Sequence, residues 1–141
     1  MKRFYLLICL FMVFSLSACR NDGGAGSTDE LLRLGRTYAN AGDSRNAILA
    51  LTKASKSAGR DSASLGLIFS EIAKVYRQTG DYAEEISYLS KAEKAYDNSG
   101  KPYSSRMARF ESAVASYMAQ DYKTASVALK SVMDDAVATS D

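Results

Sequence analysis

The sequence contains no histidine and no tryptophan, a single proline and only two cysteines. Without histidine, a Ser-His-Asp triad cannot form, and metal sites lose one of their commonest ligands. Both cysteines, Cys9 and Cys19, lie near the N-terminus. The rest of the chain has no phosphate-binding loop, nucleophile elbow or metal cluster. The sequence therefore predicts a protein that is not an enzyme and that needs no metal or cofactor.

An excess of charge is also lacking. The formal charge of +2 comes from Lys2 and Arg3, because from Cys19 onward sixteen Lys and Arg balance sixteen Asp and Glu. A neutral chain has no electrostatic attraction for phosphate backbones, so we expect no nucleic-acid partner.

Adjacent carboxylates at Glu84 and Glu85 point in different directions on a helix and cannot form an acid–base pair. We interpret them as a capping residue and a surface charge.

The one long apolar run lies at the N-terminus, in "MKRFYLLICLFMVFSLSACR". A basic start precedes the apolar residues Phe4 to Leu16, and small residues follow up to Cys19. Thirteen helical residues rise about 20 Å, too short to cross a hydrocarbon core of about 30 Å. Residues 1–18 are therefore predicted to be a signal peptide. Cys9 would leave with it, so the mature chain would have no disulfide.

The segment Leu16-Ser17-Ala18-Cys19 resembles the lipobox of bacterial lipoproteins. The resemblance implies cleavage after Ala18 and acylation of Cys19, and hence an anchor in a membrane of the cell envelope. An ordinary secretory peptide with an incidental cysteine is the alternative. Arg20 stands where proteobacterial families use Asp for inner-membrane retention, so the resemblance implies the outer membrane.

Residues 19–28 are rich in Gly and poor in apolar side chains, which predicts a flexible tether after the acylated cysteine. Ser27 and Glu30 then form the spacing of a capping box just before Leu31. From residue 29 to residue 141 we expect helices throughout. Gly42-Asp43 and Gly80-Asp81 lie 38 positions apart, each after one apolar-periodic run and before another, which predicts two antiparallel helical hairpins.

These residues resemble the tetratricopeptide repeats. The first copy matches at Leu31, Leu34, Gly35, Tyr38, Gly42, Ala47, Leu51 and Ala54, and the second at Phe69, Ile72, Ala73, Tyr76, Gly80, Tyr82, Leu89 and Ala92. A third, weaker copy is Phe110, Ala113, Tyr117, Asp121, Tyr122, Ala125, Leu129 and Val132. Its turn has Gln120 in place of the glycine, which leaves two phases open for this copy, one residue apart. The resemblance implies an all-α fold, a short right-handed solenoid of about three hairpins. It also places Tyr38, Tyr76 and Tyr117 between helices.

The spacing departs from the family period of 34. Asp43, Asp81 and Asp121 are 38 and 40 residues apart, so another helical repeat of longer period is an alternative. The second helices or the linkers must therefore be longer than in the family. The linkers "SAGRDSAS" and "DNSGKPYSS" are expected to take up the extra length, with Pro102 in the first turn of the helix after the second linker.

A stack of hairpins implies a concave face lined by the first helices, which in this family holds a peptide or a partner's helix. The resemblance places on this face Leu32, Arg36, Ala39, Asn40, Ser70, Lys74, Arg77 and Gln78. These residues predict a mildly basic groove for an acidic or neutral peptide. The alternative is a solvated face without a partner.

The chain is thus predicted to be a lipid-anchored interaction adaptor or scaffold whose protein partner the sequence does not identify. Apolar residues near its end, Val127, Leu129, Val132 and Met133, predict an exposed edge. Three outcomes stay open for that edge: a partner, a second copy of the chain, or continuation into a longer array. The last layout resembles longer tetratricopeptide lipoproteins of Bacteroidota, some of which lead to a signalling module.

Overall fold

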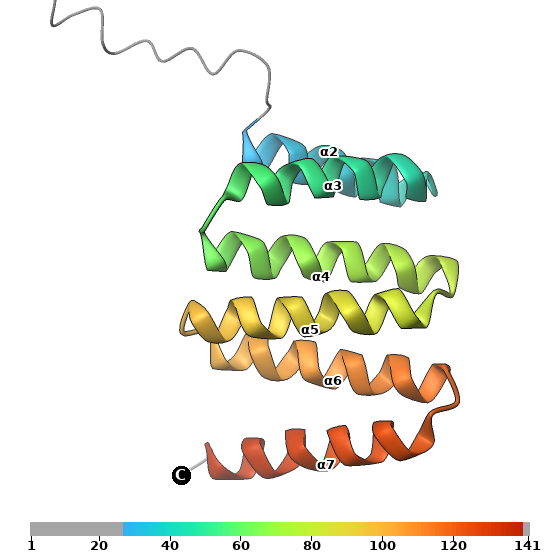
Figure 1. Ribbon diagram of the computed structural model, residues 1–141, viewed down its shortest axis with the longest axis vertical. Helices are drawn as coiled ribbons and strands as arrows, with labels where there is room; N and C mark the ends of the chain where they lie inside the picture. Colours follow the sequence, from blue (N-terminus) through green and yellow to red (C-terminus); the bar gives the residue numbers. More distant parts are fainter. Residues whose placement is uncertain (1–26, 140–141) are drawn as a thin grey trace, which may run out of the picture.

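The computed structural model describes residues 27–139, and these residues form six helices and no strand. The helices are α2 (Thr28–Asn40), α3 (Ser44–Ala58), α4 (Ser62–Thr79), α5 (Tyr82–Asn98), α6 (Pro102–Met118) and α7 (Tyr122–Ala138). They stack in chain order from α2 at one end to α7 at the other (Figure 1). The predicted all-α class and the consecutive packing of a helical-repeat solenoid are confirmed. The predicted signal peptide (residues 1–18), the cleavage site after Ala18 and the acylated Cys19 all lie outside the described residues.

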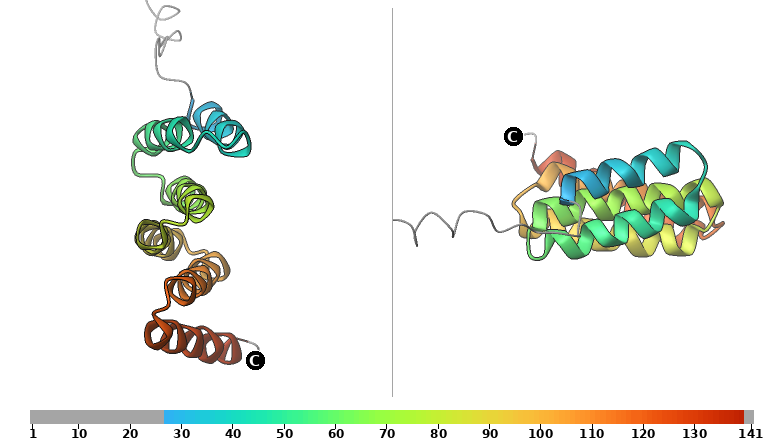
Figure 2. Two further views of the ribbon diagram at one scale, coloured as in Figure 1. Left: turned by 90° about the vertical axis from the view of Figure 1, so that its right-hand side faces the viewer. Right: turned by 90° about the horizontal axis from the view of Figure 1, so that it is seen from above.

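The chain runs back and forth between two layers, with α2, α4 and α6 in one and α3 and α5 in the other (Figure 2). Each helix packs chiefly against the helices before and after it. No helix within residues 27–139 is long and apolar enough to cross a membrane.

The largest core lies between α2, α3 and α4. Its buried members are Leu32, Ala47, Leu51, Ala54, Ile68, Ile72 and Val75. Small residues allow the helices to approach: a Cβ on Gly35 would lie only 2.5 Å from Cγ of Leu51. A smaller cluster of Ala92, Tyr96 and Ala108 joins α5 to α6. By contrast, α7 buries only Ala125.

The hairpin turns share one hydrogen-bonding pattern. In each, the capping aspartate donates its backbone N–H to the carbonyl five residues earlier: Asp43 to Tyr38 at 2.9 Å, Asp81 to Tyr76 at 3.0 Å and Asp121 to Ser116 at 2.9 Å. The third turn keeps this geometry without glycine, because Gln120 itself takes the left-handed conformation, with φ 65°. Ser116 therefore holds the position of Tyr38 and Tyr76, so the structure selects the other of the two open phases and Tyr117 lies one residue beyond that position.

This shift explains why Tyr117 is not in the core. Tyr38 and Tyr76 are partly buried against the core between α2, α3 and α4. Tyr117 is exposed and makes an edge-to-face contact with Tyr122, at 5.3 Å between ring centroids.

Two further predictions are corrected by the packing. Leu34 matches an apolar position of the resembled repeat, which implies a place in the core beside Gly35. In the structure Leu34 is exposed, and α2 buries Leu32 and Gly35 instead. The linkers are shorter than expected, since only residues 59–61 and 99–101 lie between helices. The long repeat spacing is thus taken up mainly by longer helices, and Pro102 begins α6 as predicted.

Aspartates cap the starts of most of the helices. The side chain of Asp43 accepts a hydrogen bond from the backbone N–H of Asn46, and that of Asp121 accepts one from Thr124. Asp61 accepts from Ser64 through both its hydroxyl and its backbone. These hydrogen bonds lower the pKa of all three carboxyl groups.

A lowered pKa makes the caps sensitive to acid. Each carboxylate stabilises the folded state above its unfolded pKa of about 3.9, and this stability is lost as the pH falls through the lower folded value. Asparagine caps without titrating. Changing Asp43, Asp61 and Asp121 together to Asn should therefore flatten the loss of helical circular dichroism in acid. A matched change of the exposed, non-capping Asp97 to Asn should leave the acid transition unchanged; an unaltered transition in the triple variant would contradict this role.

Candidate functional site

Three of the helices present one common surface, which we call the first-helix face. It is formed by α2, α4 and α6, which are the first helices of the three hairpins. Ion pairs link α2 to α4 and α4 to α6 across it. Arg36 on α2 donates to Glu71 on α4 at 2.9 Å, and Arg77 on α4 donates to Glu111 on α6 at 2.9 Å. These contacts show that the outward sides of the three helices form a continuous surface.

Most of the residues that the sequence predicted for this surface do lie on it. Arg36, Asn40, Lys74, Arg77 and Gln78 are exposed on α2 and α4. Ser70 is half-buried, with its hydroxyl 3.4 Å from that of Tyr96, and Ala39 packs partly against the core.

Leu32 is placed differently. It is only 7% exposed and belongs to the core between α2, α3 and α4. The corresponding residue on α4 is Ser70, 38 positions later, so α2 uses an apolar side chain where α4 uses a polar one. Leu32 therefore offers little surface to a partner.

The predicted basic character of this surface is not what the structure shows. Lys74 and Arg36 both donate to the same carboxylate oxygen of Glu71, at 3.2 and 2.9 Å. Arg77 is held by two glutamates, Glu85 and Glu111. Because each cation has a carboxylate partner, this part of the face is close to neutral, and charge alone does not select an acidic peptide.

Glu85 was interpreted as a surface charge, and this was wrong. It is 1% exposed, and its Oε1 accepts a hydrogen bond from Nε of Arg77 at 2.5 Å. Its Oε2 has no hydrogen-bond partner among the described residues. Burial raises the pKa of Glu85, and the hydrogen bond and charge of Arg77 act in the opposite direction. The carboxylate is a bridge between α4 and α5 rather than a site open to a ligand.

The third hairpin carries face residues that the sequence analysis missed. With Asp81 and Asp121 aligned, the positions of Ser70, Lys74, Arg77 and Gln78 on α4 become Phe110, Val114, Tyr117 and Met118 on α6. All four are exposed, from 38% for Val114 to 59% for Tyr117. Aligning the copies on their capping aspartates, rather than on their tyrosines, would have found them.

These residues belong to a longer apolar stripe on α6. Tyr103, Met107, Phe110, Val114 and Tyr117 follow one another at spacings of four and three, so they lie along one side of the helix, and all are exposed. Exposed apolar side chains in a contiguous stripe are typical of a protein interaction surface. The first-helix face is thus largely polar on α2 and α4, and it becomes largely apolar on α6.

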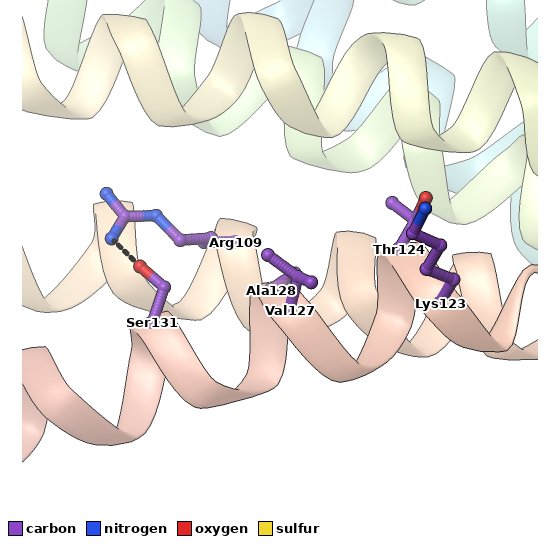
Figure 3. A pocket seen from close by; sticks show the side chains of 6 residues that line it. All are labelled: Arg109, Lys123, Thr124, Val127, Ala128 and Ser131. Carbon is purple, nitrogen blue, oxygen red and sulfur yellow. Dashed lines mark hydrogen bonds between the residues drawn. The ribbon is translucent and has the colours of Figure 1, made fainter.

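A separate hollow lies on another side of the last hairpin. It has a volume of about 450 Å³ and is lined by Arg109 of α6 and by five side chains of α7 (Figure 3). Arg109 and Ser131 lie at one end and Lys123 and Thr124 at the other, with Val127 and Ala128 between them. Glu93 at 2.8 Å and Asp135 pair with Arg109, so the cation is already neutralised.

Nothing in residues 27–139 points to catalysis. No group of three or more His, Cys, Asp or Glu side chains is arranged there to hold a metal ion. The chemistry that the first-helix face offers is contact with apolar side chains on α6 and hydrogen bonding on α2 and α4.

Comparison with known proteins agrees with this geometry. The family model described as tetratricopeptide repeat matches residues 31–60 and 68–99. These segments cover most of α2 and α3 and most of α4 and α5, so tetratricopeptide repeats are detected in the first two hairpins. Among proteins of curated function, none matches the chain. Domains with tetratricopeptide repeats typically bind protein partners, which suggests a role in protein–protein interaction.

Proposed function

We propose that this protein is a lipid-anchored adaptor of the bacterial cell envelope that holds a segment of a partner protein on its first-helix face. The observation that carries the proposal is the exposed apolar stripe on α6, where Phe110, Val114 and Tyr117 stand at positions that are Ser70, Lys74 and Arg77 on α4. A partner segment with an apolar part for α6 and a polar part for α2 and α4 fits this surface. The neutral pairing of Arg36, Lys74 and Arg77 favours polar contacts over a strongly acidic sequence.

The anchor in this proposal is Cys19, acylated after removal of residues 1–18, with residues 19–28 as the tether. The sequence supports it through the lipobox-like Leu16-Ser17-Ala18-Cys19, and Arg20 favours the outer membrane. Two or more acyl chains bind a bilayer stably, whereas one chain binds it only marginally. In the proposed role as an adaptor, the protein requires no cofactor and carries out no reaction.

Site-specific photocrosslinking of the full-length protein in its own cells tests the function. Phe110 is replaced by a photoreactive phenylalanine, and Leu49, exposed on α3, is replaced in the same way as the control. We expect a defined partner adduct at position 110 and none at position 49. The partner peptide identified from the adduct is then available for binding measurements.

A second variant tests whether the stripe holds the partner. Changing Val114 and Tyr117 to Ser removes exposed apolar contacts and should weaken binding of that peptide about tenfold or more, as expected for apolar anchors of an interface. The loss of folding stability should be small, because both side chains are exposed and only the contact of Tyr117 with Tyr122 is removed with them. Equal adducts at positions 49 and 110, or unchanged affinity in the variant, would argue against the first-helix face.

A further inference from the structure

The exposed side of α3 is a strongly basic surface. Residues 44–60 contain four cations and no carboxylate, although the chain from Cys19 onward is neutral as a whole. The four cations are Arg45, Lys53, Lys56 and Arg60, and all of them are exposed. The charges of the chain are therefore unevenly distributed, with a positive excess on α3.

Helical spacing brings these cations together. Arg45, Leu49, Lys53 and Lys56 follow one another at spacings of four, four and three, so they share one side of α3. The residues that α3 buries in the core lie on its opposite side. Leu49, which is 53% exposed, stands in the middle of the cations. We call this side of α3, together with Arg60 just beyond the helix, the α3 basic face.

None of the four cations has a carboxylate partner. No ion pair or side-chain hydrogen bond joins any of them to another residue within 27–139. Asp43 lies near Arg45, but its carboxylate accepts hydrogen bonds from the backbone and side chain of Asn46. The three cations of the first-helix face, by contrast, are all paired. The α3 basic face is thus left to pair with anions outside the protein.

The other second helices lack this pattern. The positions of Arg45, Lys53 and Lys56 are Ala83, Lys91 and Lys94 on α5, and Lys123, Ser131 and Asp134 on α7. Lys91 also lies over the ring of Tyr88, at 4.0 Å from its centroid. The positive charge at these positions therefore decreases from α3 towards α7.

The α3 basic face lies beside the point where the chain enters the fold. The hydroxyl of Thr28, at the start of α2, donates a hydrogen bond to that of Ser57, the neighbour of Lys56, at 3.2 Å. The first hairpin, α2 and α3, forms one end of the stack, and α7 forms the other (Figure 1). Thr28 follows Cys19 by nine positions, a length of chain that spans at most about 30 Å. An acyl anchor on Cys19 would therefore keep the α3 basic face close to the bilayer.

We propose that the α3 basic face docks on anionic phospholipid headgroups of the membrane that holds the anchor. The inference rests on the acylated Cys19 of the proposed function. The guanidinium and ammonium groups pair with headgroup phosphates, and Leu49 reaches the apolar boundary between them. Because α3 belongs to the other layer of the stack, docking leaves the first-helix face free for the partner (Figure 2).

The charge of the face sets the strength of docking. Each basic residue near an anionic surface strengthens the contact about fivefold, so four of them strengthen it several hundredfold. For a protein without an anchor this is binding only in the millimolar range. The anchor makes docking an intramolecular step, for which the same charges are sufficient. Docking should weaken as salt is added, because ions screen surface charges over about 8 Å at physiological ionic strength.

Fluorescence quenching in vesicles tests the docking. The mature full-length protein with its acyl anchor is inserted into vesicles of phosphatidylcholine, alone or mixed with phosphatidylglycerol, in which some headgroups carry a quencher. A fluorophore is attached to Leu49→Cys on α3, or to Met133→Cys on α7 at the far end of the stack. We expect the label at position 49 to be quenched several-fold more in the anionic vesicles, and salt to remove the difference. The label at position 133 should not respond to lipid charge.

Two triple variants that lose the same charge separate the α3 basic face from a general effect of charge. Changing Arg45, Lys53 and Lys56 to Gln should lower the ratio of docked to undocked protein about a hundredfold. The matched control, at equivalent positions of α5 and α7, is the triple variant Lys91→Gln, Lys94→Gln and Lys123→Gln. It should keep most of the docking. Thermal unfolding should be similar in both variants, because all six side chains are exposed.

Each failure has its own signature. Quenching at position 49 that ignores lipid charge, or an equal loss in the two triple variants, would overturn the proposal. A protein adduct at position 49 in the photocrosslinking experiment would assign the face to an acidic protein instead. Intact mass of the purified protein reports the anchor: without acyl chains, the anchor and the docking fail together, whereas an acylated protein that does not dock overturns the docking alone.

Discussion

Replacing Arg77 by methionine should lower the free energy of unfolding by about 3–5 kcal/mol at neutral pH, the usual cost of leaving a buried charge without its partner. Glu85 is 1% exposed, and Arg77 supplies the hydrogen bond recorded for its carboxylate. Methionine keeps most of the length of the arginine stem, so the loss reports on the charge rather than on packing. Denaturant unfolding of the purified protein measures the change.

The loss should depend on pH in a defined direction. Burial already raises the pKa of Glu85, and removing the guanidinium raises it further. Between the unfolded pKa, about 4.3, and the raised folded value, the native protein keeps a proton that the unfolded chain has released. Stability therefore falls as the pH rises through this window, and the Arg77 variant should recover part of its loss in mild acid.

A second substitution should rescue the variant. Ala47 and Ala125 occupy the position of Glu85 in the other two hairpins, where both are buried. Changing Glu85 to Ala removes the unpaired charge, so the double variant should regain most of the lost stability. If the double variant is no more stable than Arg77→Met alone, the ion pair does not account for the loss.

Replacing Leu51 by alanine is expected to cost about 2–5 kcal/mol, the range for truncating a fully buried leucine. Leu51 is 1% exposed in the core between α2, α3 and α4, and Gly35 packs directly on it. The change removes apolar contacts and leaves a cavity that rigid helices cannot fill. Thermal and denaturant unfolding both measure the effect.

The same substitution at Leu129 is the matched control. Leu129 has the same distance from its capping aspartate but is only half-buried. Its truncation should cost about 1 kcal/mol or less, because water already reaches part of the side chain. Equal losses at Leu51 and Leu129 would mean that α7 is as well packed as α3, contrary to the structure.

The hairpins could be predicted because their signals are local. A turn residue in the left-handed region, an aspartate that caps the next helix and apolar residues at helical spacing all act within a few residues of one another. Gly80 and Asp81 specify their turn without help from the rest of the chain. The same logic failed at the third turn, where Gln120 takes the left-handed conformation and Tyr117 suggested the wrong phase.

The site was harder to predict because exposure depends on how neighbouring helices are rotated. A shift of one residue on α6 moves a side chain by about 100° around the helix. It therefore decides whether Tyr117 or Ser116 faces the core. Leu32 and Leu34 show the same sensitivity on α2, since both are apolar and the packing of α3 and α4 buries only the first.

By itself, the sequence determined that this protein is a series of capped helical hairpins, since each hairpin is specified by contacts between residues close together in the chain. Only the tertiary structure decided that Glu71 and Glu111 neutralise the polar part of the first-helix face, that Glu85 is buried, and that α6 keeps its apolar stripe exposed. These properties depend on pairs such as Arg36 with Glu71 and Arg77 with Glu111, 35 and 34 residues apart. Such pairs meet only after the helices have stacked, and no local pattern contains them.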